Sequence, residues 1–456
     1  MVQQQVAPNG RMRVVGIDDL FFSTTDRKGV ITGANSVFQR LSAFPRAELM
    51  GAPHNVIRHP EMPGGAFRLM WDTIGEHRPF AAYVRNLAKD GYTYWVFATV
   101  TPLGDGYLSV RSAPCAPEML ETASALYDAS LPAEQVAREH GQSRAESAVS
   151  GRDQFAELLR EAGYDSYEDF MFTALPAEAT ARVAASKRLL ARPDAQGELG
   201  EVLRSAVALR DELDAILGRL DSLQALAESL GAVAAQLSAT LRDLAEVTAV
   251  ASEASQQVEA RAPILASTAR AMNALGGGVD RAIRPLAERL RALKSKVMEL
   301  RFLIALGHLH DDMVINFAVE VLDGLAPPEG LSYVPLLCQA LTEDVLGLAR
   351  ELEAAGSSLV NVASEVDACS AEFGQFQKLL TAWRLQVPRY GMSRTLGPLV
   401  GPIDAQLSRG HEELAALRSL AGQCVDEARP VDHRALQRPI DRISEATATL
   451  LAALRN

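Results

Sequence analysis

The chain has 456 residues with a formal net charge of −12, and 48 % of its residues are hydrophobic. This length and composition allow a sizeable core and suggest more than one structural unit. The chain holds no block rich in Lys and Arg, which disfavours nucleic-acid binding because phosphate neutralisation needs clustered cations. Its four cysteines are scattered without C-x-x-C spacing, so neither a disulfide framework nor a zinc site is indicated.

No membrane span or export signal is predicted. No unbroken apolar run reaches the roughly 18 residues that a membrane span needs. The first ten residues, MVQQQVAPNG, lack the apolar stretch of a signal peptide. We therefore expect a soluble cytoplasmic protein.

Aromatic residues are unevenly spread along the chain. They cluster between Phe21 and Tyr107, whereas residues 190–300 are mostly Ala, Leu, Glu and Arg. This asymmetry favours a compact mixed domain followed by long helices. The predicted segments are an N-terminal extension, the mixed domain, a helical connector, a long-helix signalling region and closing helices, at residues 1–17, 18–115, 116–200, 201–385 and 386–456.

Alternation and turn residues predict five strands in the mixed domain. Apolar alternation on both sides of the tight turn at 26–29 indicates a hairpin of residues 18–25 and 30–32. Short helices are expected over 36–43, 45–51 and 66–74, the first with Asn35 as its N-cap. Three further strands are expected over 80–87, 92–102 and 107–112. The order predicts an α+β fold, an antiparallel five-stranded sheet with short helices on one face and room for a ligand between them.

The stretch 54–63, HNVIRHPEMP, is the candidate site. It places an amide, a guanidinium, two imidazoles and a carboxylate within ten residues, and its two prolines restrict the backbone. Because burying unpaired polar groups is costly, the stretch is expected on the surface or lining a pocket. A surface loop with incidental charge is the simpler alternative.

Residues 18–113 resemble a PAS domain, and more narrowly the flavin-binding PAS domain of bacterial aerotaxis receptors. The resemblance covers about one fifth of the chain and rests on motifs that occur in order. These motifs are S-T-T-D at 23–26, A-N at 34–35, E-L-x-G-x-P-H-N at 48–55, R-H-P-x-M-P at 58–63, A-F at 66–67, M-W at 70–71 and Y-W-V at 94–96.

The resemblance implies a sensor of redox or oxygen state that holds FAD. Trp71 and Asn86 could supply the apolar slot and the amide that an isoalloxazine ring needs, and Arg58 suits a pyrophosphate. Re-pairing of Asn86 or Arg58 on flavin reduction is expected to bias the helices through the sheet. The predicted cofactor-binding residues are Asn35, Arg58, His59, Glu61, Trp71, Asn86 and Trp95, with Glu61 at a position where the family usually has Asp.

Other interpretations of these residues stay open. His59 could ligate haem, as some PAS histidines do. Asn35 could be only a helix cap, and Trp71 and Trp95 could be simple core residues. The domain could also bind another small ligand, or no cofactor at all and serve only as a dimerisation scaffold.

The helical region carries a heptad seam. Its members are spaced four and three residues apart over five heptads, which is typical of a coiled coil that buries the seam against a second helix. A homodimer through these helices is the expected outcome, and a bundle within one chain is the alternative. The seam residues are Leu209, Leu213, Ile216, Leu220, Leu223, Ala227, Leu230, Ala234, Leu237, Leu241 and Leu244.

Gly and Pro residues predict interruptions in this region. Breaks are expected at 131–132, 150–151, 175–176 and 192–193, and a kink or joint at 276–278 and Pro285. A helix from about 283 to 325, a sharp turn at 327–330 and a helix from about 333 predict an antiparallel hairpin. The chain is expected to be broken again between 388 and 398 and to close with helices at about 402–428 and 434–454.

The predicted hairpin resembles the signalling tip of chemoreceptors. The matching residues are N-x-A-x-E at 316–320 and E-D-V-L-G-L-A at 343–349. The resemblance implies a chemotaxis histidine kinase and its coupling protein, or another receptor, as partners. An Ala/Leu-rich hairpin matched by composition alone is the alternative.

A phosphorelay is the remaining rival. The motif G-H-L-H-D-D at 307–312 resembles the phosphoacceptor His-Asp of some histidine kinases, so His310 could accept phosphate from a partner. A solvated helix histidine is the simpler interpretation, and no Gly-rich ATP-binding elements follow. No nucleophile–base pair or metal cluster is visible, so an enzyme is not expected.

Overall fold

The structure is a computed structural model that describes residues 6–185, 192, 194–427 and 429–454, with the backbone alone for 276–284 and 287. The chain forms two compact units, and neither is continuous in sequence. The first consists of Met1–Leu217, Met298–Leu348 and Asp432–Asn456, and the second of Gly218–Val297 and Ala349–Val431.

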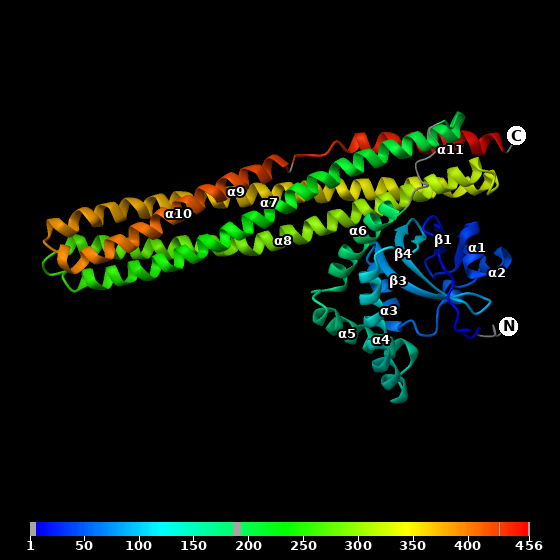
Figure 1. The fold of residues 1–456 in the computed structure, drawn as a ribbon, viewed down its shortest axis with the longest axis horizontal. Helices are drawn as coiled ribbons and strands as arrows, with labels where there is room; N and C mark the ends of the chain where they lie inside the picture. The colour runs from blue at the N-terminus through cyan, green and yellow to red at the C-terminus, as the bar shows by residue number, and fades with distance from the viewer. Residues whose placement is uncertain (1–5, 186–191, 193, 428, 455–456) are drawn as a thin grey trace. The chain divides into compact units, whose positions relative to one another are not determined.

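The amino-terminal domain has the predicted α+β fold, with a five-stranded antiparallel sheet (Figure 1). The strand order is β2-β1-β5-β4-β3, so the first hairpin pairs with the last strand. Four helical segments stand between β2 and β3. Three of them correspond to the predicted helices, and the 3-10 helix η1 was not predicted. The strands are β1 (Phe21–Asp26), β2 (Ile31–Ala34), β3 (Phe80–Leu87), β4 (Thr93–Leu103) and β5 (Gly106–Ser112), and the helices are α1 (Ser36–Ser42), α2 (Arg46–Leu49), the 3-10 helix η1 (His54–Ile57) and α3 (Gly64–Gly75).

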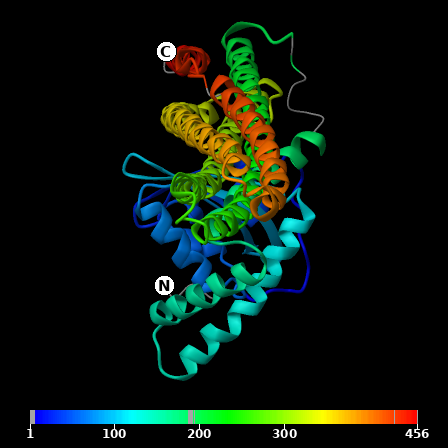
Figure 2. The same cartoon turned by 90° about the vertical axis from the view of Figure 1, so that its left-hand side faces the viewer.

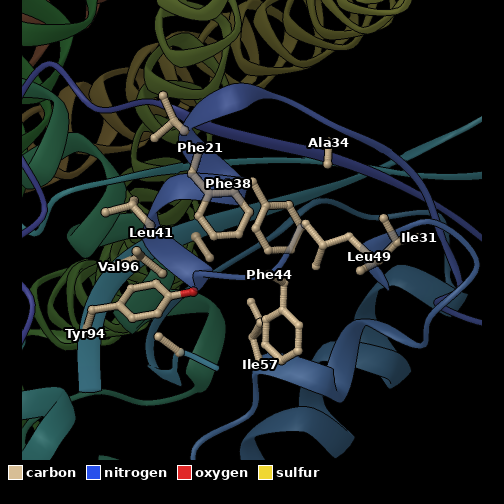
Figure 3. Packing of buried hydrophobic residues seen from close by; sticks show 13 residues of the cluster. Phe21, Ile31, Ala34, Phe38, Leu41, Phe44, Leu49, Ile57, Tyr94 and Val96 are labelled. Carbon is tan, nitrogen blue, oxygen red and sulfur yellow. The ribbon is translucent and has the colours of Figure 1, made fainter. Parts of the chain in front are cut away.

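The inner face of the sheet packs against α1, α2 and η1 to form a core (Figure 3). Phe21 of β1 stacks on Phe38 of α1 with ring centroids 4.0 Å apart, and Tyr94 and Val96 of β4 close the other side. Because side chains alternate across a strand, the intervening residues of each strand point to the outer face. The sheet therefore has two apolar faces, and both need cover.

Helices of the first unit cover the outer face. Tyr83 of β3 donates a hydrogen bond to Glu178 of α6, and Trp95 of β4 stacks on Tyr127 of α4. Phe22 of β1 meets Phe317 of α8 (Pro263–Leu322) edge to face. The connector helices are α4 (Pro117–Glu139), α5 (Arg144–Glu161) and α6 (Tyr167–Ala185), of which α4 and α6 lie on the sheet and α5 packs on α3 and α4.

The predicted breaks at 131–132, 150–151 and 175–176 are wrong. Pro132, Gly151 and Pro176 lie inside α4, α5 and α6, and the chain turns after His140 and after Ala162 instead. Packing against the neighbouring helices compensates for the backbone hydrogen bond that each proline lacks. The predicted break at 192–193 involves Pro193, which lies outside the described residues.

Long helices build the rest of the chain. They are α7 (Gly197–Gln256), α8 (Pro263–Leu322), α9 (Val334–Arg389), α10 (Ser393–Glu427) and α11 (His433–Ala453), with the 3-10 turn η2 (Pro328–Tyr333) before α9. The predicted hairpin is confirmed in α8 and α9, which run antiparallel as the ion pair Arg289–Glu365 shows. At 276–278 and Pro285, where a kink or joint is predicted, α8 stays helical, so the chain has no joint there. Gly397 and Pro398 likewise lie inside α10, so the closing helix expected from 402 begins at Ser393.

The second unit is a bundle of four helical segments from α7, α8, α9 and α10 (Figure 1; Figure 2). Every residue of the predicted seam is buried within a single chain, with Leu230 and Leu237 at 0 % exposed. The seam therefore does not by itself require a second copy.

One segment among the described residues, Glu288–Leu322, is long and apolar enough to cross a membrane. Of its most apolar window, 78 % is buried in the structure. That degree of burial is what the interior helix of a folded protein shows.

Candidate functional site

A cavity of about 230 Å³ lies between the inner face of the sheet and the segments η1 and α3. Its walls are mostly apolar, and a few polar side chains converge on it, which is the usual composition of a small-molecule site. Apolar lining residues come from β3, β4 and α3: Phe80, Ala82, Val84, Ala98, Val100, Phe67, Met70 and Ile74.

Asn86, at the end of β3, is the polar residue that most clearly indicates a ligand. Its side chain is 3 % exposed and lines this inner cavity. Its amide nitrogen Nδ2 has no hydrogen-bond partner among the described residues. A buried amide donor without a partner costs about 1–3 kcal/mol, so the cavity presents a donor that a ligand oxygen would satisfy.

A wider outer cleft of about 1090 Å³ adjoins the inner cavity. The two share Asn55, Arg58, Phe67 and Trp71 as lining residues. The cations that line the outer cleft outnumber its two carboxylates. They are Arg58, Arg68, Lys89, Arg138 and Arg144, against Glu48 and Glu134.

Arg58 stands where the cavity and the cleft meet. Its Nη2 donates to the Met62 carbonyl at 2.7 Å, and its guanidinium lies 4.3 Å from the Phe67 ring centroid. Burial lowers the pKa of Arg58, and Glu134 opposes that effect. The side chain is therefore held in place by its own loop and by α3.

His59 and Glu61 belong to the outer cleft or its surroundings. His59 is 3 % exposed and lines the cleft but not the inner cavity, and its Nδ1 accepts from the Glu61 amide at 3.2 Å. Burial lowers the pKa of His59. The Glu61 carboxylate is exposed and pairs with Arg85 at 2.6 Å.

The remaining predicted residues divide between the two faces of the sheet. Trp71 lines both the cavity and the cleft and meets Tyr107 edge to face. Trp95 points to the outer face, where it stacks on Tyr127 and under Arg85, so the sheet separates it from the cavity. Asn35 caps α1: it accepts from the Phe38 and Phe22 amides and donates to the Leu20 carbonyl, so its hydrogen bonds are used within the fold.

The sequence did not single out His54 and Arg111 as a pair. Arg111 Nη1 lies 2.9 Å from His54 Nε2, and Ser23 Oγ lies 3.2 Å from the same nitrogen. Burial, and to a smaller degree Arg111, lowers the pKa of His54 well below its usual value, so the ring is neutral and its Nε2 can accept from Arg111. Fifty-seven residues separate the two, and only the pairing of β5 in the sheet brings them together.

Glu134 was also missed, because it comes from α4, in the connector. It is 5 % exposed, and its carboxylate accepts from the amides of Gly64 at 2.9 Å and Gly65 at 2.7 Å. An anion therefore already occupies the N-terminus of α3, at the border of the outer cleft. Gly64 and Gly65 lie in the segment that resembles a PAS domain, but nothing in the sequence indicates that their amides bond to Glu134.

A family model described as the PAS fold matches residues 31–108. Those residues form a PAS domain. Over 100 residues the chain is 41 % identical to the aerotaxis receptor of Escherichia coli (strain K12), and over 81 residues it is 30 % identical to the nitrogen fixation regulatory protein of Klebsiella pneumoniae. These alignments cover 21 % and 18 % of this chain, and 20 % and 16 % of the relatives. A solved PAS domain from Colwellia psychrerythraea is 21 % identical over 21 % of this chain and 85 % of its own, with a TM-score of 0.19.

The outer face of the PAS sheet meets a buried polar cluster on the long helices. His310 of α8 is 0 % exposed, with Nδ1 2.7 Å from Asp344 of α9 and Nε2 3.4 Å from Thr101 of β4. The two residues that follow His310 on α8, Asp311 and Asp312, both pair with Arg210 of α7. Burial raises the pKa of Asp311 to about 8, although Arg210 opposes that shift.

Proposed function

We propose that this protein is a non-catalytic, cytoplasmic signal-transduction receptor whose PAS domain binds FAD and reports redox or oxygen state to the helices. The PAS domain and its likeness to an aerotaxis receptor and a nitrogen fixation regulatory protein support a signalling role. The observation that carries the cofactor proposal is the unpartnered Asn86 amide in an apolar cavity that opens onto a cationic cleft.

The residues present fit a flavin dinucleotide whose ring lies in the inner cavity and whose phosphates lie in the outer cleft. The inner cavity of about 230 Å³ is smaller than the roughly 300–1,000 Å³ of sites for whole ligands, so it suits a ring system. The outer cleft, with Arg58, Arg138 and Arg144, suits the phosphates. Asn86 would donate to a ring carbonyl, and Trp71 would close the passage between cavity and cleft.

The cofactor would supply a change of charge and protonation on reduction, and the strands would carry its effect to the helices. Neighbouring residues on one strand point to opposite faces of the sheet. Val100 lines the cavity while Thr101 reaches His310, and Ser23 lines the cavity while Phe22 packs on Phe317. A strand that moves on the ligand side therefore also moves the side chains that contact α8.

The other predictions for the site fit the geometry less well. Haem ligation by His59 would need that ring in the inner cavity, but it lines the outer cleft. Phosphate transfer to His310 would need an accessible ring, but both its nitrogens face protein partners and the residue is fully buried. A kinase with its coupling protein as output partner stays a proposal that rests on the hairpin motifs. A homodimer also stays a proposal, and it would need a surface other than the heptad seam, which is buried within one chain.

The absorption spectrum of the purified full-length protein tests the proposal. We expect the two visible bands of an oxidised flavin, lost on anaerobic reduction, and FAD in the supernatant after heat release and chromatography. A Soret band would replace FAD with haem. A protein that stays colourless after incubation with FAD would contradict the flavin proposal and favour the cofactor-free scaffold.

A further inference from the structure

Arg111 of β5 carries a buried charge that no carboxylate balances within the part of the chain that the structure describes. The residue is 8 % exposed, and its guanidinium lies 4.6 Å from the Phe21 ring centroid. Nη1 is 2.9 Å from His54 Nε2, and Nε is buried without a hydrogen-bond partner. The side chain lines the inner cavity together with Asn86.

This environment destabilises the charge of Arg111 as long as the cavity holds no anion. Arginine stays protonated in proteins, so burial cannot remove its charge. Burial does lower the pKa of Arg111, to about 10, which leaves the group charged at neutral pH. The neutral His54 and Ser23 accept or donate single hydrogen bonds but supply no negative charge. A buried charge without a counter-charge destabilises a fold, so its presence at a cavity wall points to a charge on the ligand.

We infer that Arg111 anchors a negative charge on the bound ring and so makes the cavity favour the reduced flavin over the oxidised one. The inference rests on the proposed function and deepens it. Reduction by two electrons with uptake of one proton leaves the isoalloxazine ring with one negative charge. In the test below dithionite supplies the electrons and water supplies the proton. Arg111 then gains the counter-charge that it lacks when the ring is oxidised and neutral.

The test is the midpoint potential of FAD bound to the full-length protein. Arg111→Met keeps a long apolar stem but removes the charge, so the reduced form should be held at least tenfold less tightly relative to the oxidised form. For a two-electron couple that corresponds to a potential about 30 mV lower. Arg111→Lys keeps the charge and should stay close to the wild type. Arg27→Met, which removes an exposed charge that lines neither the cavity nor the cleft, is the matched control and should also leave the potential unchanged.

A second measurement uses the protein without flavin. Because the empty cavity leaves Arg111 unbalanced, Arg111→Met should raise the melting temperature of the apo-protein, whereas loss of a merely structural residue would lower it. Wild-type potential in Arg111→Met with normal FAD content overturns the inference while the proposed function stands. If the wild type binds no FAD, the proposed function fails, and the apo-protein then decides: a higher melting temperature supports an anion site at Arg111, and a lower one overturns it.

Discussion

Two buried asparagines of the PAS domain show how differently similar residues are used. Asn35 makes three hydrogen bonds within the fold, two accepted and one donated. Asn86 is equally buried, yet its Nδ2 has no partner among the residues that the structure describes. The sequence analysis assigned both to one flavin-binding set. In the structure the hydrogen bonds of Asn35 are used within the fold, whereas the Asn86 amide is left to face the cavity.

Replacing each asparagine by leucine should separate the two roles. Asn86→Leu should weaken FAD binding about tenfold, equivalent to about 1.4 kcal/mol for one lost hydrogen bond, without destabilising the apo-protein. Asn35→Leu, the matched control, should lower the free energy of unfolding by roughly 2–4 kcal/mol because a cap and a buried pairing are lost. FAD titration and chemical denaturation measure the two effects. A destabilised apo Asn86→Leu protein would show that this amide also serves the fold.

Glu134 gives a second prediction at the level of single residues. Glu134→Gln removes a negative charge beside Arg58 and one acceptor from the Gly64 and Gly65 amides. The apo-protein should lose about 1–2 kcal/mol of stability, and FAD should bind more tightly because its phosphates no longer face a carboxylate. Calorimetry and FAD titration measure both, with the exposed Glu139→Gln on the same helix as the control. Weaker FAD binding in Glu134→Gln would exclude phosphates from this part of the cleft.

Short motifs predict the local geometry of single residues, whereas flavin binding by these residues stays a prediction. The cap by Asn35 and the placement of Arg58 and Trp71 beside a pocket follow from short motifs. The partners of His54, Arg111 and Glu134 could not be found from sequence, because strand pairing and helix packing join them over 57 to 70 residues. The sequence does place Arg111 on a strand, but only the three-dimensional register shows which face it lines.

Among the structural elements, β4 provides the most direct connection from cavity to helices. Thr101→Val removes the hydroxyl that meets His310 and should leave FAD content and potential unchanged. It should reduce the redox-dependent change in α8 and α9, because the ligand-side shift no longer reaches His310. Hydrogen exchange of the full-length protein, oxidised against reduced, measures that change. Thr99→Val is the control, since Thr99 bonds within the sheet to the Val110 carbonyl; an equal loss in both variants would contradict the proposed route.

The buried cluster on α7 and α8 should make stability depend on pH. The pKa of Asp311 is raised to about 8 in the fold against about 3.8 when exposed, so the folded chain binds a proton that the unfolded chain does not. This contribution is fully present below pH about 4 and is lost as pH rises toward 8. Arg210 pairs with both Asp311 and Asp312, and Arg182 pairs with Asp312. Arg210 lowers the pKa of Asp311 and Asp312 raises it. Asp311→Asn cannot ionise, so it should gain stability relative to the wild type between pH 5 and pH 8 in denaturation experiments. If the free energies of unfolding of Asp311→Asn and the wild type differ by the same amount at pH 5 and at pH 8, Asp311 is ionised in the fold.

At the level of elements, strands were easier to predict than helix ends. Strand β3 begins and ends where alternation predicts, since flanking turn residues limit it on both sides. Pro132, Pro176 and Pro398 were interpreted as breaks and Pro285 as a kink or joint, yet all four lie inside helices. Long-range packing stabilises a helix through a proline, and that packing is not visible in local sequence.

For the whole molecule, burial of the heptad seam within one chain predicts that the melting temperature does not depend on protein concentration. Leu237→Asn places an amide at a position that is 0 % exposed, which should cost about 2–5 kcal/mol. Because the seam is buried within one chain, the melting temperatures of variant and wild type should not change over a hundredfold range of protein concentration. Melting temperatures that fall on dilution would show that a second copy contributes to the fold. Val250→Asn on the exposed side of α7 is the control.

The discontinuous first unit has a consequence for how the protein is made. Thr101 and His310 are 209 residues apart, so the sheet leaves the ribosome long before the helix that covers it. At 5–20 residues per second, about 10–40 s pass in which the outer face of the sheet has no α8 against it. Throughout that interval the nascent chain exposes Phe22 and other apolar side chains that the finished protein buries. Synthesis speed and chaperone supply should therefore govern the yield of this protein more than that of a chain whose PAS domain is complete in one stretch.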